Sequence, residues 1–160
     1  MQPEPDKLGA LLDTARALEE AGVRYALIGG LAVGIHAGLP RATLDVDVAA
    51  HLGTGREKAI EALERAGLKK TGEFEHSVNF RHDTGEPVQL AFDAAFDVMI
   101  ERAETIDVAG IGVRVVRKDD LIAMKRRAAA DPARRKSKRL RDQADVELLL
   151  GDVPDADEGW

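Results

Sequence analysis

Two aspartates separated by a single residue, Asp45 and Asp47, are the first candidates for chemistry in this sequence. They lie in residues 43–50, where polar and apolar side chains alternate with the period of a β-strand. Both carboxylates therefore point to one face, where they repel each other unless a cation lies between them. The chain has no cysteine. Hard oxygen ligands favour magnesium, with manganese as an alternative.

A glycine pair, Gly29 and Gly30, precedes the aspartates in the sequence. It follows a short, mostly apolar run, residues 23–28, and it leads into LAVGIHAG, which is long enough for one or two helical turns. A strand–glycine–helix turn lets the backbone approach a ligand closely and offers unpaired N–H groups to phosphate oxygens. A triphosphate bound at this turn would complete the coordination shell of a magnesium ion held by the aspartates.

Three further residues are candidates for contact with a nucleotide. Lys125 lies on one helical stripe with apolar neighbours, so it either meets a β or γ phosphate or pairs with an acid. Arg41 either contacts phosphate, which we favour, or forms a salt bridge beside the aspartates. Thr43, on the aspartate face, either orients a metal-bound water or is only structural.

Positive charge is concentrated near the C-terminus. Residues 114–141 contain twelve Lys or Arg against three Asp, a local balance of +9 in a chain whose net charge is −6. Within this region the block from Arg134 to Arg141 is the densest. We interpret the segment as an electrostatic footprint for phosphates, and a solvated helical face is the alternative.

The elements that position these residues follow from hydrophobic periodicity. Helices are expected over residues 8–21, 59–66, 96–103, 119–130 and 134–150, and strands at 23–28, 43–50, 77–81, 88–93 and 113–116. This order predicts one α+β domain over residues 1–150, closed by helices at about 119–150, with a flexible tail at 151–160.

Composition excludes several classes of protein. Without cysteine there is no disulfide scaffold, thiolate zinc site or thiol catalysis, and 4% aromatic residues argue against a stacking platform for single strands. The longest uncharged stretch is too short to span a bilayer, and the acidic, proline-bearing start is unlike a signal peptide. We therefore expect a cytoplasmic protein that does not enter membranes.

The ordered combination of Gly29-Gly30, Arg41, Thr43, Asp45 and Asp47 resembles the signature of the polymerase-β-like nucleotidyltransferase superfamily. It is most similar to small bacterial members, including the nucleotidyltransferase toxins of type IV toxin–antitoxin systems. The resemblance covers roughly residues 8–148. One departure is that fourteen residues separate Gly30 from Asp45, which is at the long end of the usual spacing.

The resemblance implies a small mixed β-sheet flanked by helices. It also implies a magnesium-dependent enzyme that moves a nucleoside monophosphate from an NTP to a hydroxyl on RNA, protein or a small molecule. Gly29 and Gly30 would hold the triphosphate, and Asp45 and Asp47 would bind two metal ions for in-line attack on the α-phosphorus. The acceptor, RNA such as tRNA or a protein, would bind the basic segment from Arg134 to Arg141, and an antitoxin or toxin partner is also implied.

A third carboxylate completes the metal site in such enzymes, and its position here has two candidates. Gln89 and Asp93 share a face of the strand expected at 88–93. We favour Asp93 as a metal ligand and catalytic residue. If Gln89 is the equivalent, the third acid is missing, which favours a catalytically silent nucleotide-binding or regulatory relative. A nucleic-acid-binding module that uses the basic segment is a further alternative.

Overall fold

The computed structural model describes residues 7–38 and 45–151, so Arg41, Thr43 and residues 152–160 lie outside the described residues. The described part forms one seven-stranded sheet with the strand order β3-β4-β5-β2-β1-β7-β6. The strands are β1 (Tyr25–Ile28), β2 (Val46–Ala50), β3 (Lys69–Glu73), β4 (Ser77–Arg81), β5 (Pro87–Ala91), β6 (Glu104–Val108) and β7 (Ile111–Val115).

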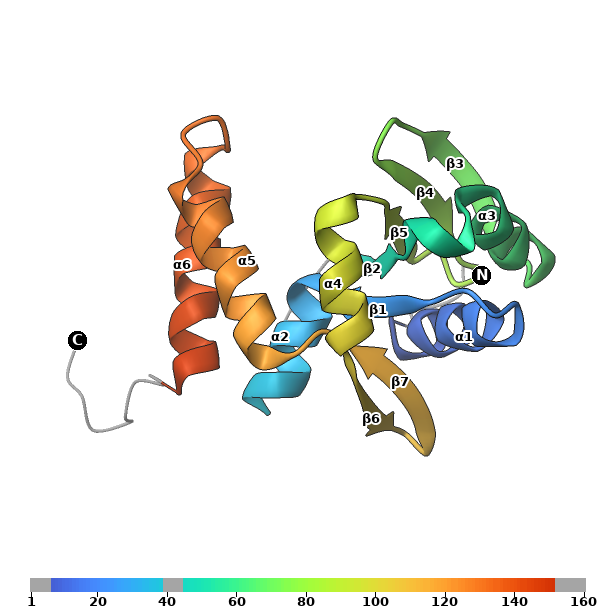
Figure 1. The fold of residues 1–160 in the computed structure, drawn as a ribbon, viewed down its shortest axis with the longest axis horizontal. Helices are drawn as coiled ribbons and strands as arrows, with labels where there is room; N and C mark the ends of the chain where they lie inside the picture. The colour runs from blue at the N-terminus through green and yellow to red at the C-terminus, as the bar shows by residue number, and fades with distance from the viewer. Residues whose placement is uncertain (1–6, 39–44, 152–160) are drawn as a thin grey trace.

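Six α-helices accompany the sheet in the described residues (Figure 1). They are α1 (Lys7–Glu20), α2 (Gly29–Ala37), α3 (Arg56–Arg65), α4 (Ala94–Arg102), α5 (Lys118–Ala130) and α6 (Lys136–Leu150), with a 3-10 turn, η1, at Leu52–Thr54.

Strand β2 lies in the middle of the sheet and has neighbours of both orientations. It pairs antiparallel with β1, which places Asp47 opposite Ile28, and parallel with β5, which places Asp47 level with Gln89. β1 also pairs in parallel with β7. The sheet is therefore mixed, and the expectation of a mixed sheet flanked by helices is confirmed.

The two faces of the sheet differ in chemistry because side chains alternate along each strand. One face is apolar and fully buried, with Val46, Val48, Val88 and Leu90 all at most 1% exposed, and α1 and α3 cover it. The opposite face has Asp45, Asp47 and Gln89, and it is covered by α2 and α4, both of which pack on β1 and β2. The polar face over β4 and β5 is only partly buried.

Two strands are absent from the expectations. β3 and β6 are the outermost strands, and their sequences, KKTGE and ETIDV, are mostly exposed. An edge strand with little burial has no clear apolar alternation, so periodicity could not reveal it. The fifth strand also ends earlier than expected, at Ala91 rather than Asp93, because Asp93 instead begins α4.

Helices α5 and α6 form a hairpin at one end of the molecule, away from α1 and α3 (Figure 1). The turn between them contains Pro132, which cannot continue α5. Leu121 and Leu149 are fully buried, and the hairpin packs against α2 as well as on itself. The two expected closing helices are confirmed.

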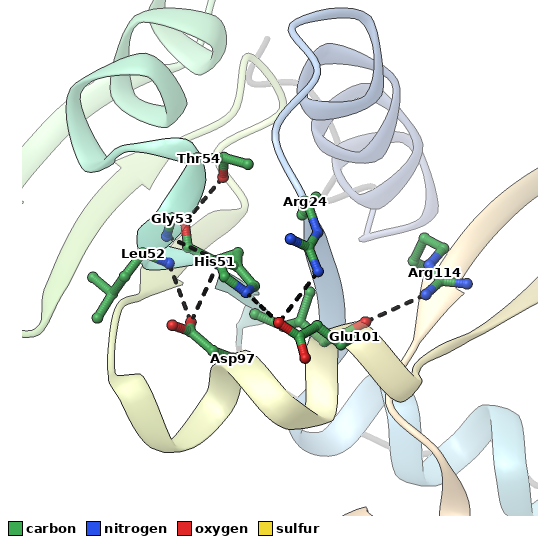
Figure 2. A network of polar contacts seen from close by, with 9 residues as sticks. Arg24, His51, Leu52, Gly53, Thr54, Asp97, Glu101 and Arg114 are labelled. Carbon is green, nitrogen blue, oxygen red and sulfur yellow. Dashed lines mark hydrogen bonds and ion pairs between the residues drawn. The ribbon is translucent and has the colours of Figure 1, made fainter.

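A polar network fixes α4 on the sheet (Figure 2). His51, which follows β2, accepts a hydrogen bond on Nδ1 from the Gly53 N–H at 2.9 Å, so its Nε2 donates to Glu101 of α4 at 3.1 Å. Glu101 also pairs with Arg24 at 3.4 Å. The bond from His51 and the charge of Arg24 hold the pKa of Glu101 below its usual value. The network anchors the C-terminal end of β2, whereas the aspartates lie at its N-terminal end.

We predict that His51→Ala lowers the free energy of unfolding by about 1–2 kcal/mol, because the Gly53 N–H and the Glu101 carboxylate each lose a hydrogen-bond partner. Urea denaturation measures the change. His76→Ala is the control, since the His76 side chain is 69% exposed. Equal stability of the two variants would contradict an anchoring role.

Candidate active site

The glycine turn and the aspartate pair are in direct contact. Gly29 has a left-handed backbone conformation with φ of 74°, which glycine adopts without cost. A Cβ atom at this position would lie 2.4 Å from Oδ2 of Asp47. Only glycine therefore allows the start of α2 to approach the carboxylate this closely, and the first N–H groups of α2, which begins at Gly29, have no partner within the helix.

Burial and charge make Asp47 an unusual carboxyl group. Burial away from solvent is the larger cause and repulsion from Asp45 the smaller one, and together they raise the pKa of Asp47 to about 6. The positive charge of Lys125 opposes this shift. A carboxylate in such surroundings has a lower energy when a cation is bound to it. The structure thus brings Asp45, Asp47 and Gly29 together and places Lys125 within electrostatic range.

Lys125 is held by two buried acids. Its Nζ lies 3.3 Å from Asp142 and 3.0 Å from Asp145, and these side chains are 3% and 0% exposed. Arg134 adds a bond of 2.7 Å to the other oxygen of Asp142. Of the two interpretations of Lys125 from sequence, pairing with acids is present in the structure, and contact with phosphate stays a prediction.

Sequence reasoning did not recognise that Asp142 and Asp145 form a site with Lys125. The available signal was their spacing of three residues on α6, which puts both on the helix face that also buries Leu149. Two acids on a buried face need cationic partners. A lysine on the buried stripe of the neighbouring helix is such a partner.

Asp93 is not brought to the aspartate pair. It lies outside β5 and caps α4, where its side chain accepts the Ala95 N–H at 2.9 Å. It follows Gln89 by four residues, about 13 Å along an extended chain. Gln89 is the residue level with Asp47 on the neighbouring strand. The premise that Asp93 lies on the strand face beside the pair is therefore wrong, and its predicted metal role has no support in this geometry.

The basic segment divides into two groups. Arg134 is bound to Asp142, and Nε of Arg139 is buried. Four others, Arg135, Lys136, Lys138 and Arg141, are exposed on the hairpin. Only the second group is available to a large ligand, so part of the cationic block is structural.

The site is suited to a divalent cation shared with a ligand. Within residues 7–38 and 45–151, no three His, Cys, Asp or Glu side chains converge as a complete metal cage. Asp45 and Asp47 supply two carboxylates, one of them desolvated. Magnesium is commonly held by one or two carboxylates and completes its shell with phosphate oxygens and water. The residues present therefore fit magnesium in the company of a nucleotide.

A mixed sheet with a glycine turn against paired aspartates defines a nucleotidyltransferase of the polymerase-β-like fold. Within that class the chain belongs to the family described as "Nucleotidyl transferase AbiEii toxin, Type IV TA system", whose pattern matches residues 10–158. The chain therefore belongs to a family of enzymes that act as toxins, as the resemblance implied. Such a family implies an antitoxin partner. No curated protein matches the sequence.

Solved structures share the fold at low sequence identity. A lincomycin-bound lincosamide antibiotic adenylyltransferase, LnuA, has a TM-score of 0.65 and 14% identity, covering 94% of this chain and 99% of its own. ANT(2")-Ia in complex with adenylyl-2"-tobramycin has a TM-score of 0.64 and 16% identity, and the match covers 92% of this chain and 90% of that protein. An antigenic nucleotidyltransferase-like protein from Paracoccidioides brasiliensis has a TM-score of 0.62 and 20% identity, and the match covers 97% of this chain and 81% of that protein.

None of the helices in the described part of the chain has the length and apolar character needed to cross a membrane.

We predict that Asp47→Asn raises the free energy of unfolding in the absence of metal. The raised pKa of about 6 means that the ionised carboxylate destabilises the folded state above that pH, whereas below pH 4 both states are protonated. The gain should be on the order of 1–3 kcal/mol at pH 8 and should vanish towards pH 4.

Urea denaturation of the wild type and the variant at several pH values, with EDTA present, measures this difference. Asp83→Asn, in the exposed turn between β4 and β5, is the matched control. A stability difference that is independent of pH would contradict the desolvation of Asp47.

Proposed function

We propose that the chain is a magnesium-dependent nucleotidyltransferase that moves a nucleoside monophosphate from an NTP to a hydroxyl group of RNA. The observation that supports it most is the contact between Gly29 and Asp47, which sets a phosphate-binding turn against a carboxylate pair. The alternatives of a protein or small-molecule acceptor, and of a silent nucleotide-binding relative, are outcomes of the experiments below.

Each residue has a distinct task in this proposal. The N–H groups at the start of α2, at Gly29 and Gly30, bind phosphate oxygens of the NTP. Asp45 and Asp47 hold magnesium, which when bound neutralises charge on the phosphates and the attacking oxygen. Lys125, held by Asp142 and Asp145, provides a fixed positive charge for the β or γ phosphate. Arg41 and Thr43 keep their proposed contacts with phosphate and metal-bound water.

The choice of RNA rests on the hairpin. Its four exposed cations lie on α6 and at its start, and Arg126 and Arg127 of α5 are exposed as well. A surface of this kind binds a phosphate backbone with little regard for sequence. The proposal places the acceptor backbone on the hairpin and the nucleotide at α2.

We predict that label from at least one [α-³²P]NTP is transferred to total tRNA in the presence of magnesium. Asp45→Asn and Asp47→Asn should each reduce the rate by at least about 100-fold, because a metal ligand is lost while the shape of the side chain is kept. Asp83→Asn should have the wild-type rate. Gel separation of the labelled products measures the transfer.

Transfer to a co-purified protein or to a small hydroxyl compound, with tRNA unlabelled, would contradict the choice of RNA. Binding of NTP without transfer to any acceptor would favour the silent relative. Full activity of Asp45→Asn together with Asp47→Asn would contradict the metal site.

We predict that replacing Lys136, Lys138 and Arg141 by alanine raises the KM for tRNA by about three- to tenfold at physiological salt and leaves the KM for NTP within twofold. The slope of log K against log salt should become shallower by about two, because a protein that makes fewer phosphate contacts releases fewer counterions when it binds RNA. The control changes three exposed cations on the opposite side of the molecule, Arg16, Lys58 and Arg65. Equal tRNA kinetics in the two triple variants would contradict the role of the hairpin.

A further inference from the structure

A row of polar side chains extends from the aspartates across the neighbouring strands. Asp47 of β2 is level with Gln89 of β5, which is level with Asn79 of β4. The Gln89 amide donates a hydrogen bond to the Asn79 carbonyl oxygen at 3.3 Å. Both residues are only partly buried, so their remaining polar atoms are accessible from the aspartate face. We call Gln89 and Asn79 the amide pair.

The glycine turn limits where an acceptor can enter. Gly29 follows β1 and lies against Asp47 from that side. A triphosphate bound at this turn occupies the β1 side of the aspartates. The attacking and leaving oxygens are roughly in line in phosphoryl transfer, so the acceptor hydroxyl must approach from the opposite side. In the strand order that side is β5 and β4, which is where the amide pair lies.

Across the sheet from β2 to β3, the side chains on this face change from the acidic aspartates to the neutral amide pair and then to cations. In the next row of the same face, Arg81 of β4 lies opposite Pro87 of β5 and Lys69 of β3, and both cations are exposed. An amide offers both donors and acceptors to a hydroxyl without attracting a cation. Exposed cations beyond it favour a nearby phosphate.

We infer that Gln89 and Asn79 bind the acceptor hydroxyl, and that this neutral pair, followed by Arg81 and Lys69, selects the ribose end of an RNA over a cationic acceptor. This inference rests on the proposed function and assigns its acceptor subsite. Gln89 is then a specificity residue, and the amide at this position does not indicate a silent site. The hairpin and the edge formed by Arg81 and Lys69 are two separate contacts for one acceptor.

The first experiment changes the charge of the pair. Gln89→Glu keeps the size of the side chain and adds a carboxylate level with Asp47. We expect Mn²⁺ to bind at least fivefold more tightly to this variant without nucleotide, by electron paramagnetic resonance titration. We also expect the Kd for tRNA, measured with a non-hydrolysable NTP analogue, to rise at least fivefold.

Ala66→Glu is the matched control, because it adds the same charge at an exposed position at the end of α3, away from the acceptor path. It should leave the Mn²⁺ affinity unchanged and alter the Kd for tRNA less than twofold. Asn79→Ala should raise the Kd for tRNA by about threefold without changing Mn²⁺ affinity, because it removes a hydrogen bond and no charge.

The second experiment addresses the positive edge. Arg81→Glu combined with Lys69→Glu should raise the Kd for tRNA about tenfold and leave binding of the NTP analogue within twofold. Lys58→Glu, an exposed reversal on α3 on the other face, is the control. Tobramycin, a cationic compound rich in hydroxyl groups, should not compete with tRNA for the wild type.

These readouts separate this inference from the proposed function. Unchanged Mn²⁺ and tRNA affinities in Gln89→Glu, or tobramycin competing with tRNA, would overturn the amide pair as the acceptor subsite. Absence of label transfer in every protein, with the tRNA effects intact, would overturn the transferase proposal and leave the pair as an RNA contact.

Discussion

The repulsion between two carboxylates on one strand face is the constraint on which the rest of this structure depends. Asp47 is desolvated by the turn that begins α2, and its pKa of about 6 reflects that burial and the charge of Asp45. Such a pair costs stability unless a cation is supplied. Gly29 lets α2 pack against β2, and this packing buries Asp47 and increases the cost. The positive charge of Lys125 on α5 reduces it.

The two ends of β2 differ in their polar contacts. At the aspartate end the carboxylates lie close together, with Asp47 depending on a distant lysine for opposing charge. At the other end the His51 ring and the Leu52 N–H donate hydrogen bonds of 3.1 Å each to Glu101 and Asp97 of α4 (Figure 2). We interpret this contrast as a division between binding and anchoring. A strand fixed firmly at one end can tolerate an energetically unfavourable arrangement at the other.

Much of the fold was accessible from the sequence because the central elements have strong periodicity. The aspartate strand, the glycine turn and the closing helices were all expected, and the alternation around Asp45 and Asp47 identified their common face. Asp93 was misplaced because the end of a strand depends on hydrogen bonding that periodicity does not encode, here the capping bond to Ala95. The cluster of Lys125, Asp142 and Asp145 was missed as a unit because it depends on how two helices pack. The register that aligns Gln89 and Asn79 with Asp47 is likewise a tertiary property.

The position of Lys125 in the chain has a consequence for the order in which the protein is made. The turn and the aspartates are complete once residue 47 has been synthesised, and the sheet positions around them once β7 exists. Lys125 and the two acids that hold it belong to α5 and α6, so they emerge from the ribosome after the glycine turn and the aspartates. A nascent or truncated chain that ends in the turn after α5 has the carboxylates and Lys125 but lacks the two acids that hold the lysine. Assembly of the full constellation therefore waits for the synthesis of α6.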